Sequence, residues 1–150
     1  MQTSEIDEDQ LAIGHALERV FAWLRENRET AGLSASTISA LSRLDGSGSL
    51  RITELSALEG LTQPGMTTLI NRLEDAGLAI REPDPLDGRA VRVSITALGV
   101  ERIRDHRETR ATRIATRLSE LPESDQRALI AARAALEAFA STTPREIAQS

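Results

Sequence analysis

Apolar residues in the middle of the chain recur first at helical spacing and then at strand spacing. Between residues 62 and 77, apolar positions three or four residues apart predict an amphipathic helix with one buried stripe. That stripe consists of Met66, Leu69, Ile70 and Leu73. Residues 78–82 and 91–95 have the composition of strands, and residues 83–90 between them contain turn-forming Pro and Gly. A shorter helical pattern, with Leu55 and Leu58 inward and Gly60 at its end, comes before the first of these elements.

This order of helix, turn, helix, strand, loop and strand is typical of a winged helix-turn-helix, a module that binds duplex DNA. The predicted second helix begins after a candidate N-cap at Thr62, accommodates Pro64 in its first turn and ends at Gly77. Its polar side chains project away from the buried stripe, so its N-terminal half can enter a major groove. The predicted base-reading residues are Gln63, Pro64, Thr67, Thr68, Asn71 and Arg72. An ordinary amphipathic surface helix is the alternative.

The loop between the two strands is predicted to form the wing. Pro83 and Pro85 stiffen it, and the Asp87-Gly88 pair is a turn signal. The tip then presents Arg89, and an arginine on a rigid hairpin can enter a narrow minor groove. We therefore predict a DNA contact at Asp87, Gly88 and Arg89, with Asp87 pairing with a nearby guanidinium to fix the turn. A solvated loop arginine is the alternative.

Helical patterns fill most of the remaining chain. We expect helices at residues 6–29, ending at Gly32, and 34–44, followed by a turn at residues 45–49 and a third strand at 50–52. A long helix should run from Thr96 to about Leu121, and a last helix should follow Pro122. Its expected inward residues are Leu129, Ala132, Leu136 and Phe139.

Hydroxyl residues stand at the expected N-termini of three helices. Free N–H groups and a partial positive charge make a helix N-terminus a natural phosphate ligand. The candidate phosphate contacts are Ser36, Thr37, Thr53 and Thr62. Each of them is equally well explained as a helix cap, with Ser34 or Ser36 capping one helix and Thr53 another.

The predicted fold is mainly α with a small β-hairpin wing. We treat residues 1–150 as a single domain, with a DNA-binding lobe at 34–95 and a helical dimerisation lobe at 6–30 and 96–140. Long, partly apolar terminal helices favour a two-fold homodimer, which would place two recognition helices about 34 Å apart on a pseudo-palindromic operator. An intramolecular bundle is the alternative.

Composition excludes several other functions. The chain has no Cys, which excludes disulfides and thiol chemistry. His15 and His106 lack metal-ligand spacing, and there is no phosphate-binding loop or nucleophile motif, so we predict no metal, no cofactor and no enzyme activity. An acidic start and no apolar run of spanning length predict a cytoplasmic protein without a membrane partner. The net charge of -5 implies that any DNA contact uses a locally basic surface.

The run from Leu61 to Gly99 resembles the MarR family of winged-helix transcriptional regulators. The resemblance is carried by Leu61-Thr62, Arg72-Leu73-Glu74 with Gly77-Leu78, Asp87-Gly88-Arg89, and Ile95-Thr96 with Gly99. It implies a homodimeric repressor of double-stranded DNA that responds to a small aromatic or phenolic effector, at residues the sequence does not identify. Thr68 stands where the family often has a basic residue, and Gly65 where Ser or Thr is common. A protein-interaction module and a constitutive regulator without effector are the alternatives.

Overall fold

The structure is a computed structural model, and it describes residues 7–27 and 32–141. The chain divides into two compact units, Met1–Thr96 and Ala97–Ser150. The first contains α1 (Glu8–Glu26), α2 (Ala35–Ser47), β1 (Leu50–Arg51), α3 (Ile52–Glu59), α4 (Gln63–Asp75), β2 (Ala79–Pro83) and β3 (Val91–Ile95). The second contains α5 (Ala97–Ser119), α6 (Glu123–Ala131) and α7 (Arg133–Ser141).

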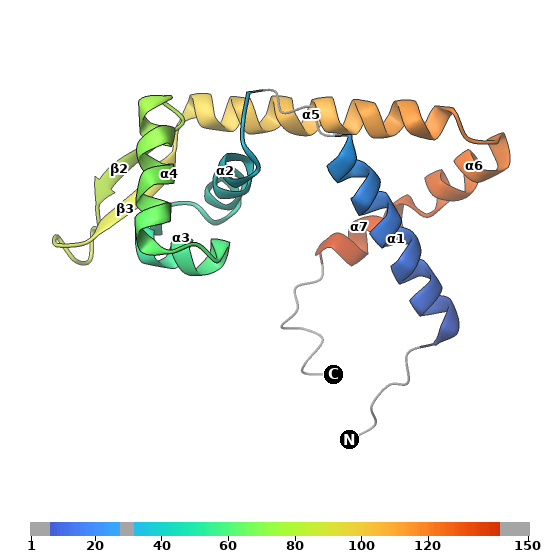
Figure 1. Ribbon diagram of the computed structural model, residues 1–150, viewed down its shortest axis with the longest axis horizontal. Helices are drawn as coiled ribbons and strands as arrows, with labels where there is room; N and C mark the ends of the chain where they lie inside the picture. The colour runs from blue at the N-terminus through green and yellow to red at the C-terminus, as the bar shows by residue number, and fades with distance from the viewer. Residues whose placement is uncertain (1–6, 28–31, 142–150) are drawn as a thin grey trace, which may run out of the picture. The chain divides into compact units, whose positions relative to one another are not determined.

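The sheet of the first unit is antiparallel with the order β1-β3-β2. The expected third strand exists, but only Leu50 and Arg51 belong to it, because Ile52 already begins α3. β2 starts one residue later than predicted, whereas β3 has the predicted bounds. Figure 1 shows the β2–β3 hairpin beside α4, and α4 also contacts α2 and α3. The predicted mainly helical winged helix-turn-helix is therefore confirmed.

The core of this unit comes from one side of each helix and from the sheet. All four predicted stripe residues of α4 are buried. They are joined by Ala40, Leu41, Leu44, Leu55, Leu78, Ala79 and Val93. Leu58 was expected inside but is 50% exposed, because Leu55 and Ser56 form the buried side of α3. At about 100° per residue, Leu58 lies about 110° from the midpoint between Leu55 and Ser56, so it falls beside the buried side and not within it.

The end of α2 and the start of α3 differ from the prediction. α2 continues to Ser47 instead of ending near Leu44, and the chain turns at Gly48, where φ is 74° and the N–H donates to the Leu44 carbonyl. Thr53 is not the N-cap of α3. Arg51 is, and its backbone N–H donates to Glu54 Oε2 at 2.7 Å, so a carboxylate three residues ahead replaces the expected hydroxyl.

The first helix is shorter than predicted. α1 ends at Glu26, where the Asn27 amide donates to the Trp23 carbonyl at 2.9 Å, so Gly32 is not its stop. Asn can close a helix in this way because its side chain satisfies a carbonyl left free at the C-terminus. Residues 6 and 28–30 of the predicted dimerisation lobe lie outside the described residues. No residue of α1 is buried.

The second unit has two short helices where one was predicted. α5 ends at Ser119, two residues before the predicted end near Leu121, and Pro122 is the N-cap of α6. Gln126 Nε2 donates to the Leu121 carbonyl at 2.8 Å. α6 and α7 are then separated at Ala132. Leu129, Leu136 and Phe139 are not inward but 45%, 43% and 69% exposed, because neither helix has a buried side in the single chain. Across the described parts of both units, no helix combines the length and apolarity needed to cross a bilayer.

Candidate nucleic-acid interface

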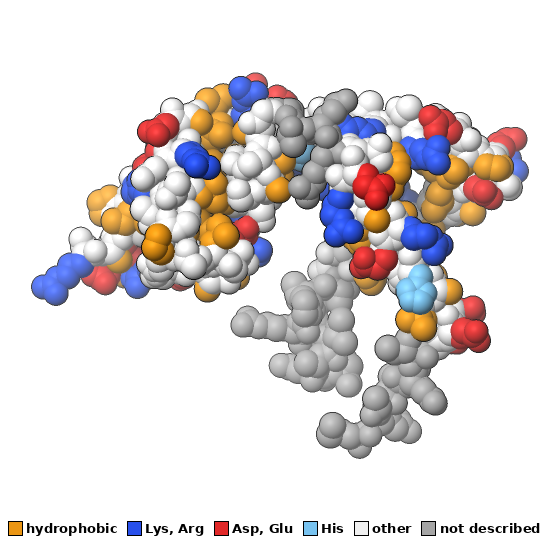
Figure 2. All heavy atoms as spheres, viewed as in Figure 1, with side chains coloured by type: hydrophobic (Ala, Val, Ile, Leu, Met, Phe, Trp, Pro, Cys, Tyr) orange, Lys and Arg blue, Asp and Glu red, His pale blue; other side chains and the backbone are white. Residues whose placement is uncertain are grey.

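The outward face of α4 is polar and open. The structure places Gln63, Pro64, Thr67, Thr68, Asn71 and Arg72 together on this helix, all exposed. Thr62 caps the helix as predicted, since its hydroxyl oxygen accepts the Gly65 N–H at 3.3 Å. Figure 2 shows that the surface over α4 consists largely of uncharged groups. Contacts from this face would therefore be hydrogen bonds and methyl contacts more than ion pairs.

The two threonines of this face have a fixed hydrogen-bonding character. Thr67 Oγ1 donates to the Gln63 carbonyl at 2.9 Å, and Thr68 Oγ1 donates to the Pro64 carbonyl at 3.0 Å. A hydroxyl has only one proton to donate. Both side chains therefore present oxygen lone pairs and a methyl group to whatever lies outside the helix.

Arg81 on β2 connects the hairpin to α4. Its guanidinium forms an ion pair with Glu74 and also donates from Nη2 to Asn71 Oδ1 at 2.8 Å. Its backbone N–H donates to Glu74 Oε1 at 3.0 Å. We call these three residues the Arg81 clamp. The clamp holds the wing strand and the recognition helix as one body, so the two predicted DNA-contacting parts share a fixed geometry.

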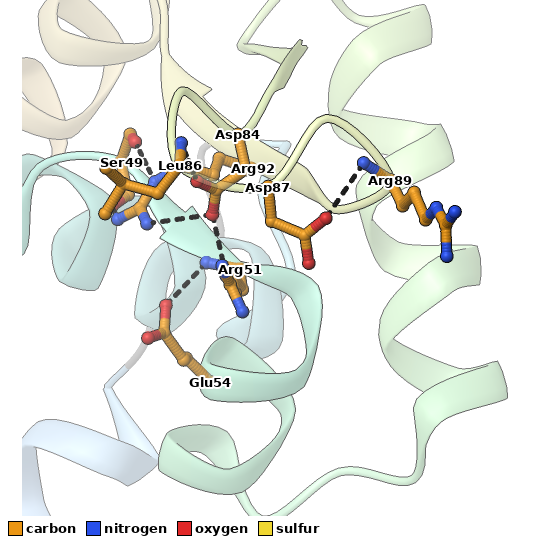
Figure 3. A network of polar contacts seen from close by, with 8 residues as sticks. All are labelled: Ser49, Arg51, Glu54, Asp84, Leu86, Asp87, Arg89 and Arg92. Atoms are coloured by element: carbon orange, nitrogen blue, oxygen red, sulfur yellow. Dashed lines mark hydrogen bonds and ion pairs between the residues drawn. The ribbon is translucent and has the colours of Figure 1, made fainter.

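The wing loop is closed by a short set of backbone contacts. The Asp84 N–H donates to the Ala90 carbonyl at 3.0 Å, and the Ala90 N–H donates to the Asp87 carbonyl at 2.8 Å. The Asp87 carboxylate accepts the Arg89 N–H at 3.1 Å, so it fixes the turn as expected, but through the backbone and not through the predicted guanidinium. The Arg89 side chain extends away from this network (Figure 3).

The guanidinium partners belong to Asp84 instead. Its carboxylate is fully buried and accepts Arg51 Nε at 2.7 Å, Arg92 Nη1 at 3.4 Å and the Leu86 N–H at 2.8 Å. We call Arg51, Asp84 and Arg92 the wing-base cluster; Figure 3 shows it at the root of the loop. Arg92 also donates to the Ser49 hydroxyl at 2.6 Å. All three strands are thereby tied to the start of the wing.

The charges of the wing-base cluster stabilise one another. The hydrogen bond from Arg51, supported by the Leu86 N–H, lowers the pKa of Asp84 from its ordinary value of 3.8 to about 2, although burial opposes this. The same hydrogen bond and the nearby negative charge raise the pKa of Arg51. Both groups therefore stay charged at neutral pH, where the cluster anchors the wing without titrating.

The candidate phosphate contacts lie at the N-termini of three different helices. At α2, the Ser34 hydroxyl accepts the Thr37 N–H, and the hydroxyls of Ser36 and Thr37 lie 2.9 and 3.0 Å from it. Ser34 is therefore the cap, and Ser36 is exposed in the first turn. Thr53 is exposed in the first turn of α3, and Thr62 caps α4.

The described residues contain no group of three or more acidic or histidine side chains that could hold a metal ion.

Arg81, Asp84 and Leu86 are among the residues of this region that sequence reasoning missed. The first two act through partners that are distant in the sequence, so local patterns gave no signal for their pairing. Leu86 in the wing is 91% exposed although it is large and apolar. Its position between Pro85 and the Asp87 turn was the available signal, because a leucine in a stiff loop cannot fold back easily onto a core.

An exposed polar helix that follows a tight turn and is clamped to a hairpin with a basic tip defines the winged helix-turn-helix class of DNA-binding proteins. Residues 31–90 match the model of the MarR family. An uncharacterized HTH-type transcriptional regulator of Mycobacterium bovis is 33% identical over 129 residues, which cover 86% of this chain and 90% of that protein. The chain belongs to the MarR family of transcriptional regulators, which bind DNA and are not enzymes.

Further relatives agree with this assignment. An HTH-type transcriptional repressor of Mycobacterium tuberculosis is 33% identical over 95 residues, covering 61% of this chain and 68% of the repressor. The crystal structure of a transcriptional regulator from Thermotoga maritima is similar with a TM-score of 0.76 at 25% identity, covering 93% of this chain and 99% of that one. The multiple antibiotic resistance repressor MarR shares the fold, with a TM-score of 0.66, 19% identity and coverage of 93% and 99%.

Proposed function

We propose that the protein is a homodimeric, sequence-specific repressor that binds a pseudo-palindromic operator. In each subunit α4 lies in the major groove, where Thr67, Thr68, Asn71 and Arg72 contact base edges. Arg89 enters the adjacent minor groove, and the N-termini of α2, α3 and α4 contact phosphates. Repression follows from occupancy of the operator.

The observation that carries this proposal is the Arg81 clamp. A recognition helix and a wing contact neighbouring grooves together only if their spacing is fixed before binding, because ordering them during binding costs affinity. Glu74 accepts both the backbone N–H and the guanidinium of Arg81, so α4 and β2 are linked at two points. The wing-base cluster fixes the other end of the hairpin in the same way.

Exposed apolar side chains on the terminal helices support the homodimer. Val20 and Phe21 on α1 are 50% and 52% exposed, and Ile130 and Phe139 on α6 and α7 are 62% and 69% exposed. Burial of such side chains against a second copy is favourable by roughly 25 cal/mol per Å² of apolar surface. A two-fold pair of subunits would then present two recognition helices to successive turns of one duplex face.

The test is an electrophoretic gel shift with the promoter region next to the protein's own gene, with a scrambled duplex of the same composition as competitor. The proposal expects a discrete complex that the scrambled duplex does not compete away. A smear that both duplexes compete equally would reduce the function to nonspecific binding. The absence of any complex would favour the second candidate, a winged-helix module that binds another protein, for which the net charge and the exposed Leu86 are the supporting features.

A small aromatic or phenolic effector is the remaining part of the proposal. One similar crystal structure, 26% identical with a TM-score of 0.53, is described as a MepR-like protein complexed with pseudoligands. An effector needs to change operator affinity by only about 1–3 kcal/mol to relieve repression. Adding candidate phenolic compounds to the gel shift tests this directly, and a complex that none of them weakens would indicate a constitutive regulator.

A further inference from the structure

Arg81 has little freedom in the Arg81 clamp. Its backbone is paired with Val93 in the centre of the hairpin, and its N–H is bound to Glu74 Oε1 at 3.0 Å. Its side chain is 29% exposed, and its guanidinium is paired with Glu74 through Nη1, which leaves Nη2 directed at Asn71. Glu74 therefore fixes Arg81 both at its backbone N–H and at its guanidinium, and this fixes the position of the Nη2 donor that reaches Asn71.

This contact decides which way the Asn71 carboxamide is turned. A guanidinium has only donors, so the group facing Nη2 must be the amide oxygen, which lies 2.8 Å away. The amide nitrogen is then turned away from Arg81. Because Asn71 is exposed on the outward face of α4, its two N–H donors remain available to an external partner.

We propose that Arg81 is a positioning residue that sets the base preference of α4 by orienting Asn71. This inference rests on the proposed function, because it concerns the base that α4 contacts. A free asparagine pairs with adenine by accepting from N6 and donating to N7 at once. Arg81 occupies one lone pair of the Asn71 oxygen and turns that oxygen toward β2, so the side chain presents chiefly its two N–H donors outward. Such donors suit the acceptor edge of guanine, N7 and O6.

The neighbouring threonines differ from Asn71 in what they offer to a base. Thr67 and Thr68 have committed their hydroxyl protons to backbone carbonyls, so they offer acceptors and methyl groups. The polar face of α4 thus has donors at position 71 and acceptors one turn earlier. A base pair opposite Asn71 should present acceptors, and those opposite the threonines should present an amino or a methyl group.

The test compares base preferences and not overall affinity. Duplexes that bind the full-length wild-type protein are selected from a randomised pool. The same selection with Asn71→Ala identifies the base pair that Asn71 contacts, because the preference at that pair is lost. At this pair we expect wild type to prefer guanine. Arg81→Lys keeps the charge beside Glu74, but its single ammonium cannot supply separate nitrogens to Glu74 and Asn71. It should move the preference toward adenine by about fivefold or more, the lower limit for one specific base contact.

The controls separate positioning from a merely structural role. Preferences at base pairs that do not depend on Asn71 should be unchanged in Arg81→Lys, and adding Arg81→Lys to Asn71→Ala should change no preference. In the free protein, ¹⁵N relaxation of the Asn71 side-chain amide should show an ordered group in wild type and a mobile one in Arg81→Lys. That measurement needs no DNA.

The outcomes distinguish the two proposals. If wild type enriches no sequence from the pool, the proposed function fails and this inference fails with it. If wild type enriches a sequence but Arg81→Lys leaves the guanine-to-adenine ratio unchanged, or the Asn71 amide is equally mobile in both proteins, only the role of Arg81 is overturned. An adenine preference in wild type would also overturn it.

Discussion

Arg51 and Asp84 are 33 residues apart in the sequence, and the Nε of Arg51 donates a 2.7 Å hydrogen bond to the buried Asp84 carboxylate. Arg51 belongs to β1 and caps α3, whereas Asp84 starts the wing. One contact therefore links the first helix of the helix-turn-helix to the loop that is proposed to enter the minor groove. The wing is an extension of the core and not an independent loop.

Replacing Asp84 by Asn should loosen the wing without unfolding the helices. The variant removes the negative charge that Arg51 and Arg92 share, while Asn keeps nearly the same volume. Hydrogen exchange of the Asp84 and Ala90 amides reports directly on wing closure, because both N–H groups donate within the loop. We expect faster exchange at positions 84 and 90 and unchanged exchange in α4. Equal rates in both proteins would show that the cluster does not hold the wing.

The same carboxylate should give the wing an acid-labile component. Because the pKa of Asp84 falls from 3.8 to about 2 on folding, the unfolded chain binds the proton more tightly. Its stabilising contribution is therefore complete above about pH 4 and is lost as the pH falls toward 2. Amide exchange at Ala90, corrected for its intrinsic pH dependence, should rise in wild type over this interval. In Asp84→Asn this additional rise in exchange rate should be missing. The same rise in both proteins would show that titratable groups other than Asp84 cause it.

The cap of the recognition helix should contribute measurably to stability. Thr62 Oγ1 accepts the Gly65 N–H, and removing it leaves that donor to water. We expect Thr62→Ala to lower the free energy of unfolding by about 1 kcal/mol in urea titrations, and Thr62→Ser to lower it much less. If Ser and Ala cost the same, the methyl group and not the hydroxyl oxygen would explain the loss.

Arg89 should contribute to DNA affinity but not to folding. Its side chain leaves the wing network, so Arg89→Ala should leave thermal stability unchanged. We expect binding to a selected operator to weaken by about 1–3 kcal/mol, with a shallower dependence of log affinity on log salt. Arg127→Ala is the matched control, since it removes the same charge from an exposed i,i+4 pair on α6. If both variants weaken DNA binding equally, Arg89 contributes only through the net charge of the protein.

The parts of the fold that follow from local spacing were predictable. Met66 and Leu73 fall on one buried side because α4 is regular, and Thr62 and Gly60 mark helix ends through local backbone chemistry. The error at Thr53 has the same local origin. A hydroxyl is the usual cap, but Glu54 can reach back to the N–H of Arg51 just as well.

The connections that give the site its rigidity were not predictable in this way. Arg92 and Ser49 are 43 residues apart, and Arg51 meets Asp84 only because β1 pairs with β3 in one register. A shift of one residue would turn Arg92 to the other face of the sheet. The break at Ala132 has no proline or glycine beside it, and the structure offers no local reason for it.

The most direct measurement is a titration of the selected operator duplex and a scrambled duplex with the full-length protein, combining fluorescence anisotropy with native mass spectrometry. Two α4 helices and two wings on one duplex predict complexes of two chains per operator, with a preference over the scrambled duplex of about a thousandfold or more. Equal affinity for both duplexes, or a saturated complex with one chain, would contradict a paired, sequence-reading interface.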